Sequence, residues 1–404
     1  MNILQLTNKM PYPANDGGSI ATLNMSKSFA ELGNKVTILA MNTPKHSFNI
    51  SDIPEELTSK ITFETVEVET DINKKDALKN LFFSDLPYNA VRFMSDDYTN
   101  KLINILKSED FDIVQLEGIY LAPYIDIIKK HSNALISLRS HNIEHEIWKR
   151  IAANETNPVK KKYINILSNR IKKFEKKYIN KYDLLVPITS RDLNVLNKMG
   201  NKKSAHVAMT GIDFHNLIID NSNTNYPSLF FIGALDWAPN QEGLNWFIKN
   251  VWPRIHTKFP NLIFKIAGRN APEKIIANFN KPNIEYIGAV DNAYQFMNQN
   301  AIMIAPLFSG SGMRIKIIEG MSLGKVIITT TIGSEGIDTN HNENILIADT
   351  EMDFIKLIEQ LVTDQNLFNK ISNNAIKFIE NNFNNNNITA ELVDFYKFQV
   401  NNLV

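Results

Sequence analysis

The chain has 404 residues, 44% of them hydrophobic, and its 43 Lys and Arg balance 43 Asp and Glu. This length exceeds what one compact core usually holds and predicts at least two domains. The neutral balance gives no support to nucleic acid as a partner, and the absence of cysteine excludes disulfides, zinc–thiolate sites and cysteine nucleophiles.

Targeting signals are not evident in the sequence. The N-terminal stretch has no basic region followed by a long apolar run, as a signal peptide would. No apolar stretch approaches the roughly 18 residues that span a bilayer. We therefore expect the protein in the cytosol.

Short apolar runs alternate with amphipathic segments along the whole chain. Strands of about five to seven residues between helical stretches predict parallel sheets covered by helices on both faces. Two successive series predict two doubly wound α/β domains. The predicted strands are NILQLT, KVTILAM, FDIVQLEG, ALISLRSHN and DLLVPIT, then SLFFIGAL, LIFKIAG, IEYIGA, AIMIAPL, KVIITT and NILIAD.

The polar stretch from His215 to Ser228 is the best linker candidate. We therefore predict a first domain over residues 1–214 and a second over residues 225–385. Ligands of open parallel sheets bind beyond the carboxyl ends of the strands. The loops that follow the strands are thus the place to look for chemistry.

The first such loop, PYPANDGGS, carries Gly17 and Gly18 just before a predicted helix. Free amides at a helix N-terminus favour an anion. A plain tight turn is the alternative interpretation, and a lone pair of glycines does not decide between them.

The second loop, RSHNIEHEIW, places Arg139, His141, Asn142, Glu144 and His145 in one short span. His141 could donate to a sugar hydroxyl or a phosphate, or act in proton transfer. The spacing does not match the HExxH zinc pattern. We predict a functional role for His141 and a structural one for His145.

The third loop, SGSGMRIKIIEG, is the richest. Gly310, Ser311 and Gly312 make an unhindered turn before a helix that starts near Met313. The amides of that helix start suit a phosphate, and cations follow directly. The spacing is not that of a P-loop.

Arg314 and Lys316 supply those cations, and Glu319 shares a helix face with Lys316. A solvated Lys–Glu pair on a surface helix is the alternative interpretation.

A fourth loop, TTTIGSEGID, carries Gly333 and Ser334 and should lie beside the third loop. A plain glycine turn and direct ligand contact are equally compatible with the sequence of this fourth loop.

Taken together, these residues resemble the family-four retaining glycosyltransferases, which have the GT-B fold of two facing Rossmann-like domains with a cleft between them. The likeness covers nearly the whole chain. It is carried by GGSIATLNMSKSFAELGNKVTIL, SHN, PITSRDLNVL, MTGIDF, FIGALDWAPNQEGLNWFIKNVWPRI, IAGRN, YIGAV and PLFSGSGMRIKIIEGMSLGKVIITTTIGSEGI.

The resemblance implies roles for these residues. The second domain would hold the nucleotide, with Glu319 on the ribose hydroxyls and the amides of 310–312 facing the diphosphate and sugar. His141 would lie near the transferred sugar, and a helix over about 386–404 would cross back to the first domain. The donor-side candidates are Gly17, Gly18, Gly233, Arg269, Gly310, Ser311, Gly312, Met313, Glu319, Gly333 and Ser334.

The sequence departs from the family pattern at two places. Ser311 stands where the family often has a first glutamate, and GALDWAPNQEG lacks the usual Arg and Lys. We therefore expect Arg314 and Lys316 to act as the catalytic cations that neutralise the diphosphate, helped by Arg269.

The predicted activity is transfer of a sugar from a UDP- or GDP-linked donor to a glycan, lipid-linked or protein acceptor, with retention at the anomeric carbon, in surface polysaccharide or glycoconjugate synthesis. No cofactor and no metal are expected, because none of the loops singled out above carries an Asp-x-Asp motif or a cysteine–histidine cluster that could hold a metal. The alternatives are a nucleotide-sugar epimerase and a catalytically degenerate subunit that binds nucleotide without turnover.

A basic segment over residues 160–182 raises the question of membrane contact. Its apolar residues recur at three- and four-residue steps, and lysines crowd the remaining surface. A basic amphipathic helix can lie on anionic lipid. The alternative is that the apolar stripe packs on the core, as in any helix of a globular domain.

Overall fold

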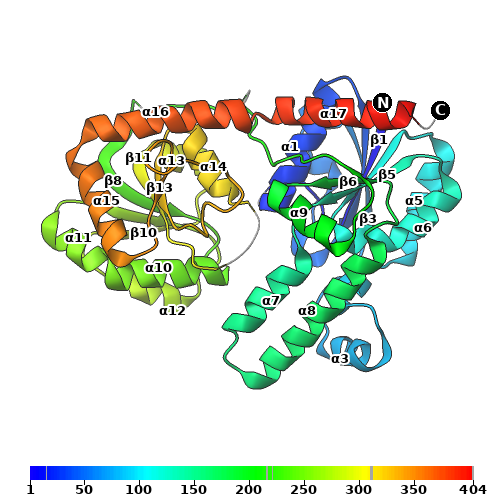
Figure 1. The fold of residues 1–404 in the computed structure, drawn as a ribbon, viewed down its shortest axis with the longest axis horizontal. Coiled ribbons are helices and arrows are strands. Elements are labelled where there is room, and N and C mark those ends of the chain that lie inside the picture. Colours follow the sequence, from blue (N-terminus) through cyan, green and yellow to red (C-terminus); the bar gives the residue numbers. More distant parts are fainter. Residues whose placement is uncertain (15, 215–216, 221, 310–312, 403–404) are drawn as a thin grey trace. The chain divides into compact units, whose positions relative to one another are not determined.

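The computed structural model describes residues 1–14, 16–214, 217–220, 222–309 and 313–402. The chain forms two compact units (Figure 1). The first comprises Met1–Gly211 with Asn385–Val404, and the second comprises Ile212–Asn384. The second unit thus begins at Ile212, whereas the sequence predicts a first domain up to residue 214 and a second from residue 225.

The first unit contains a parallel seven-stranded sheet of order β3-β2-β1-β4-β5-β6-β7. Its strands are β1 (Asn2–Thr7), β2 (Lys35–Asn42), β3 (Ile61–Glu67), β4 (Ile113–Glu117), β5 (Leu135–Ser140), β6 (Leu184–Pro187) and β7 (Ser204–Ala205). Its α-helices are α1 (Gly17–Glu31), α2 (Glu55–Thr58), α3 (Lys74–Phe83), α4 (Tyr88–Val91), α5 (Asp96–Ser108), α6 (Ile125–His131), α7 (Glu144–Asn154), α8 (Pro158–Tyr178), α9 (Ser190–Met199) and α17 (Asn385–Asn401). The described part of the unit also contains the 3₁₀ helices η1 (Pro44–His46), η2 (Ile50–Asp52) and η3 (Ile119–Tyr124).

The second unit contains a parallel six-stranded sheet of order β10-β9-β8-β11-β12-β13. Its strands are β8 (Asn225–Ile232), β9 (Phe264–Ala267), β10 (Ile284–Gly288), β11 (Asn300–Ala305), β12 (Val326–Thr329) and β13 (Leu346–Ile347). Its helices are α10 (Ala238–Asn250), α11 (Trp252–Lys258), α12 (Glu273–Ile276), α13 (Ala293–Asn298), α14 (Ile315–Ser322), α15 (Glu351–Thr363) and α16 (Gln365–Asn382), with the 3₁₀ turn η4 (Ala277–Phe279). The prediction of two doubly wound α/β domains is confirmed.

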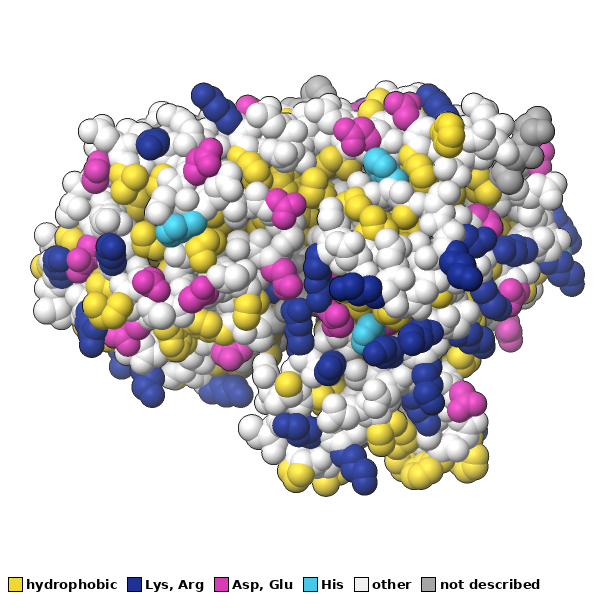
Figure 2. Space-filling view, viewed as in Figure 1, with side chains coloured by type: hydrophobic (Ala, Val, Ile, Leu, Met, Phe, Trp, Pro, Cys, Tyr) yellow, Lys and Arg dark blue, Asp and Glu magenta, His cyan; other side chains and the backbone are white. Residues whose placement is uncertain are grey.

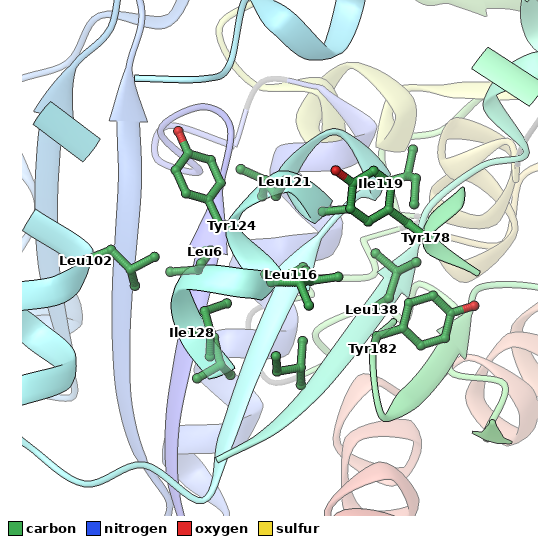
Figure 3. Close-up of a cluster of buried hydrophobic side chains, with 14 of the residues drawn as sticks. Leu6, Leu102, Leu116, Ile119, Leu121, Tyr124, Ile128, Leu138, Tyr178 and Tyr182 are labelled. Carbon is green, nitrogen blue, oxygen red and sulfur yellow. The ribbon is translucent and has the colours of Figure 1, made fainter. Parts of the chain in front are cut away.

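The central strands β4, β5, β11 and β12 are buried on both faces because helices cover both sides of each sheet. In the first unit, Leu6, Leu116 and Leu138 come from the neighbouring strands β1, β4 and β5 and belong to one buried cluster, in which Leu138 lies beside Tyr182 (Figure 3). Burying such side chains contributes roughly 1.5–3 kcal/mol each. This rigid core holds the carboxyl ends of β1, β4 and β5 in register.

The last helix, α17, belongs to the first unit and packs along α1. Tyr396 is fully buried, donates to Gln115 Oε1 at 2.7 Å, and lies 2.7 Å from Ser137 Oγ. Asn385 donates to the Asn24 carbonyl at 2.7 Å. The resemblance places a crossover helix in this part of the chain.

The basic helix α8 turns its apolar stripe toward the core. Leu167, Ile171, Phe174 and Tyr178 are all buried, so this stripe is not available to lipid. Membrane contact of the 160–182 segment stays a prediction, and it would have to use other side chains. Among the described residues, no helix is both long enough and apolar enough to cross a bilayer.

Candidate functional site

A pocket of about 230 Å³ opens beyond the carboxyl ends of β1 and β4 in the first unit. Its walls come from the loop after β1, the start of α1, the end of β4 with η3, and the loop after β5. This is the edge of the sheet where the sequence predicts ligand contact. Both Gly18 and His141 line the pocket.

A buried carboxylate, Glu117, organises the base of the pocket. Its Oε2 accepts from Arg139 Nη1 at 3.3 Å and lies 2.7 Å from His141 Nε2. Its Oε1 accepts from Gln5 at 3.2 Å and from Gln115. Burial would raise the pKa of Glu117, but the charge of Arg139 and the hydrogen bonds from His141 and Gln115 hold that pKa at about 2.

The partners of Glu117 fix the state of His141. Burial, together with the charge of Arg139, lowers the pKa of the imidazole, although the hydrogen bond to Glu117 opposes this shift. The ring is therefore neutral at pH 7. Because an ionised carboxylate can only accept, Nε2 carries the proton, which leaves Nδ1 as an acceptor. His141 can thus accept a hydrogen bond or a proton through Nδ1, whereas its own proton is committed to Glu117.

The glycine-rich turn at the start of α1 is capped from within the chain. Asp16 accepts from Ser19 N at 3.0 Å, and Lys9 Nζ lies 2.5 Å from its carboxylate. A Cβ at Gly18 would lie 3.4 Å from both Lys9 Nζ and Asp16 Oδ1, which is an ordinary contact. An anion at this helix start would have to compete with Asp16, and the role of Gly17 and Gly18 in donor binding stays a prediction.

Glu144 forms another part of the pocket wall. Its Oε2 accepts from Tyr120 Oη at 3.0 Å, and its backbone N donates to Glu175 at 2.8 Å. Burial and the charge of Glu175 raise the pKa of Glu144 to about 7, against the lowering effect of the Tyr120 hydrogen bond. The other oxygen of Glu175 bonds to Nδ1 of the buried His145.

In the second unit, charged residues gather after β11. Arg314, at the start of α14, is 7% exposed, and its guanidinium lies 5.6 Å from the centre of the Trp237 ring. Trp237 follows β8 and precedes α10. A cation over an indole face is stabilised electrostatically, so this contact orients Arg314. The stretch GALDWAPNQEG, which lacks the expected cations, supplies this aromatic ring instead.

Glu319 is 2% exposed, which contradicts the interpretation of a solvated surface pair. Lys316 Nζ lies 2.6 Å from its Oε2, and Tyr294 Oη donates to its Oε1 at 3.1 Å. The side chain of Lys316 is itself partly exposed. The carboxylate is therefore a held, oriented acceptor at the carboxyl end of the sheet.

The remaining donor-side candidates differ in exposure. Gly310, Ser311 and Gly312 lie outside the described residues. Arg269 is exposed after β9, and Met313 is buried beside Arg314 in the chain. A Cβ at Gly268 would meet the Gly233 carbonyl oxygen at 2.2 Å, so these two loops pack closely.

Gly333 and Ser334 form part of the loop after β12. A Cβ at Gly333 would lie 1.9 Å from Thr329 Oγ1, and Gly333 N donates to Thr330 Oγ1 at 3.0 Å. Ser334 Oγ donates to the Thr331 carbonyl at 3.1 Å. These contacts close the loop on its own strand, as a tight glycine turn does. Within the described parts of the chain, no group of three or more His, Asp or Glu side chains is arranged to hold a metal.

Comparisons with known proteins identify the second unit. Residues 226–364 match the family model described as "Glycosyl transferases group 1". The matched residues lie within the second unit, which is thus similar in sequence to the group 1 glycosyltransferases. Trp237, Tyr294, Arg314, Lys316 and Glu319 all lie within the matched residues.

The fold of the whole chain is that of the GT-B glycosyltransferases. Sucrose-phosphate synthase from Thermosynechococcus elongatus matches with a TM-score of 0.72 at 12% identity, covering 99% of each chain. Anabaena HepE in complex with UDP and glucose matches with a TM-score of 0.67 at 10% identity, covering 98% of this chain and 99% of HepE. Pneumococcal O-GlcNAc transferase GtfA in complex with UDP and GlcNAc matches with a TM-score of 0.66 at 14% identity, covering 99% of each chain.

A relative from Klebsiella pneumoniae matches along almost the full length. It is described as an uncharacterized 44.6 kDa protein in the cps region, and it is 24% identical over 96% of this chain and 98% of its own. The likeness therefore extends on both sides of the residues that match the family model, into the unit that holds Glu117 and His141.

Sequence reasoning did not single out Glu117, Lys9 or Trp237. Glu117 ends a predicted strand, so the rule that ligands bind at carboxyl ends could have found it. In the sequence, Glu144 is one of several polar residues of its loop. Nothing in the local sequence shows that Trp237 lies over Arg314, because that contact joins two distant loops.

The raised pKa of Glu144 predicts a pH-dependent stability. In the folded protein its carboxyl holds a proton up to about pH 7, against an ordinary value of 4.5. Folding free energy is therefore lost as the pH rises from about 4.5 through 7. We expect Glu144→Gln to stabilise the protein at pH 8.5 by about 1–3 kcal/mol and to have little effect at pH 4.5.

Urea unfolding at both pH values measures this difference. Glu56→Gln, at an exposed position on α2, is the matched control and should show no such dependence on pH. An equal effect of Glu144→Gln at the two pH values would contradict the assignment.

Proposed function

We propose that the protein is a glycosyltransferase that binds a nucleotide-diphosphate sugar through its group 1 domain and transfers the sugar to an acceptor hydroxyl. The proposal rests on two charged side chains of α14 and its start, Glu319 and Arg314, which are both buried and held in place. Glu319 is a buried, oriented carboxylate, and Arg314 is a buried, oriented cation five residues earlier. HepE and GtfA, which share the fold, are described in complex with UDP and a sugar.

Glu319 is suited to the ribose of the donor. An ionised carboxylate accepts hydrogen bonds from two neighbouring hydroxyl groups, and such charged bonds are stronger than neutral ones. Lys316 and Tyr294 already hold its two oxygens in place, which limits the entropy lost on binding. The nucleotide is UDP or GDP in this proposal.

Arg314 and Lys316 are suited to the leaving group. Transfer breaks the bond from the anomeric carbon to a diphosphate oxygen and forms a bond to the acceptor oxygen, whose proton passes to the departing diphosphate after the bond breaks. Negative charge therefore grows on the diphosphate. Cations fixed beforehand stabilise that charge without reorganising, and the indole of Trp237 fixes Arg314 in this way. Arg269, exposed after β9, adds charge at the same edge.

His141 completes the proposal in the first unit. Its neutral ring offers Nδ1 as an acceptor for a hydroxyl of the transferred sugar, while Glu117 holds Nε2.

We further propose retention at the anomeric carbon, by attack on the face that the diphosphate leaves. The acceptor is a glycan, a lipid-linked saccharide or a protein, inside the cell.

The biological setting rests on the relative from Klebsiella pneumoniae. Its printed description places that protein in the cps region. A role of the present chain in surface polysaccharide or glycoconjugate synthesis agrees with this likeness.

The ribose assignment predicts the effect of Glu319→Gln on nucleotide affinity. Replacing a charged acceptor by a neutral amide should weaken UDP or GDP binding by about 1.5–3 kcal/mol. Isothermal titration calorimetry with each free nucleotide measures the change. Glu273→Gln on α12 is the control, at an exposed position of the same unit. Unchanged affinity in folded Glu319→Gln would contradict the ribose role.

The cation assignment predicts that turnover falls more than donor binding. Arg314→Ala and Lys316→Ala should each lower kcat by roughly a hundred- to a thousand-fold, because they act on charge that grows in the transition state. Arg314→Lys should also lose turnover, since lysine keeps the charge but loses the planar fork and the stacking on Trp237.

Steady-state nucleotide release from a panel of UDP- and GDP-sugars measures these losses, with circular dichroism to confirm folding. Lys274→Ala, an exposed lysine of the same unit, should leave kcat unchanged. Changes below about 1 kcal/mol in both alanine variants would be those of an ordinary surface ion pair, and the cation assignment would then be wrong.

We also propose that catalysis needs no bound metal. In this proposal, Arg314, Lys316 and backbone amides alone stabilise the negative charge on the diphosphate. Donor turnover should persist unchanged in excess EDTA. Loss of activity that added manganese or magnesium restores would overturn this proposal.

A further inference from the structure

Helix α3 presents an apolar surface that no described residue of the first unit covers. Leu78 is 57% exposed, Phe82 71% and Phe83 83%. Leu78 and Phe82 are four residues apart and so share one face of the helix, which Phe83 extends. Adjacent exposed phenylalanines are unusual on a soluble protein, and they mark a site that contacts something else.

The exposure of α3 does not come from a loosely attached helix. Arg170 of α8 donates to two carbonyl oxygens in the last turn of α3, that of Asn80 at 3.2 Å and that of Leu81 at 2.6 Å. Just before α3, Asn73 N donates to Tyr88 Oη at 3.2 Å. The helix is thus fastened at both ends, and its phenylalanines are held on the outside.

Helix α8, to which α3 is fastened, is strongly basic on its outer face. Glu175 is the one acidic residue of α8, and it is buried against His145. The exposed lysines of α8 are Lys160, Lys161, Lys162, Lys172, Lys173, Lys176 and Lys177. Figure 1 shows α7 and α8 as a hairpin that extends away from the sheet, with α3 beside it.

The two kinds of side chain are close together on the surface. Figure 2 shows hydrophobic side chains at the end of this projection, with Lys and Arg side chains around them. Asp76 and Asp85 are also exposed near the phenylalanines, but the lysines of α8 outnumber them. The surface therefore combines an apolar tip with an excess of positive charge.

We propose that α3 and the outer face of α8 bind the surface of an anionic lipid bilayer. The rings of Phe82 and Phe83 enter the boundary between headgroups and acyl chains, and the lysines lie among the lipid phosphates. Each contribution alone gives weak, reversible binding, and stable attachment takes two such signals together. Lysines on long flexible stems suit the diffuse charge of a membrane.

This surface lies on the first unit and uses none of the residues assigned to sugar transfer. The inference therefore does not depend on the proposed function. It also differs from membrane contact through the apolar stripe of α8, since that stripe is buried.

The test is sedimentation of the full chain with vesicles, measured without donor or acceptor. Binding is expected to vesicles of phosphatidylcholine with phosphatidylglycerol, and not to phosphatidylcholine alone. The double variant Phe82→Ser, Phe83→Ser should weaken binding by about tenfold or more at any salt concentration. Lys172→Glu with Lys173→Glu should weaken it most at low salt, because screening already reduces the charge term at high salt.

Phe398→Ser is the matched control, since Phe398 is a 64% exposed phenylalanine on α17, far along the chain from this surface. It should bind like the unaltered protein, and thermal melts should show all variants folded. Absence of binding to phosphatidylglycerol vesicles, or equal binding of folded Phe82→Ser, Phe83→Ser, would overturn the proposal. So would lipid-free dimerisation that the same double variant abolishes, because the surface would then pair two copies of the chain.

Discussion

The first unit depends on keeping one carboxylate ionised away from water. Glu117 is buried, and an isolated buried charge would cost several kcal/mol. Arg139, His141, Gln5 and Gln115 offset that cost, and they come from three adjacent strands and the loop after β5. The charge therefore ties together the strand ends that form the base of the pocket. Removing one of these four partners would leave part of the cost of burying the Glu117 charge without an offsetting interaction.

In the second unit, close packing fixes the positions of the segments that follow the strands. A Cβ at Gly243 would lie 1.8 Å from the carbonyl oxygen of Pro306, so α10 lies directly against the chain that leaves β11. Thr329 Oγ1 donates to the Ala305 carbonyl at 2.7 Å, and Thr330 Oγ1 to that of Leu307. The start of the loop that leads to Arg314 is thus fixed from both sides.

The fold class could be predicted from the sequence because strand length, burial and alternation with helices are local properties. The run from Met313 to Glu319 could be selected as a candidate site because its cations, carboxylate and helix start are adjacent in the chain. The roles of Glu117 and Trp237 could not, since each depends on contacts between residues far apart in sequence. The burial of Glu319 likewise depends on tertiary packing, and i, i+3 spacing alone cannot distinguish it from a solvated pair.

The place of α17 has a consequence for the order in which the protein is made. Tyr396 completes a buried hydrogen-bond group with Gln115 and Ser137, and Asn385 bonds to α1. The first unit is therefore discontinuous, and its core lacks a piece until the ribosome has synthesised the whole second unit. During translation the second unit can therefore fold completely before the first unit, which lacks α17 until the end of synthesis. This reverses the usual N-to-C order of domain folding.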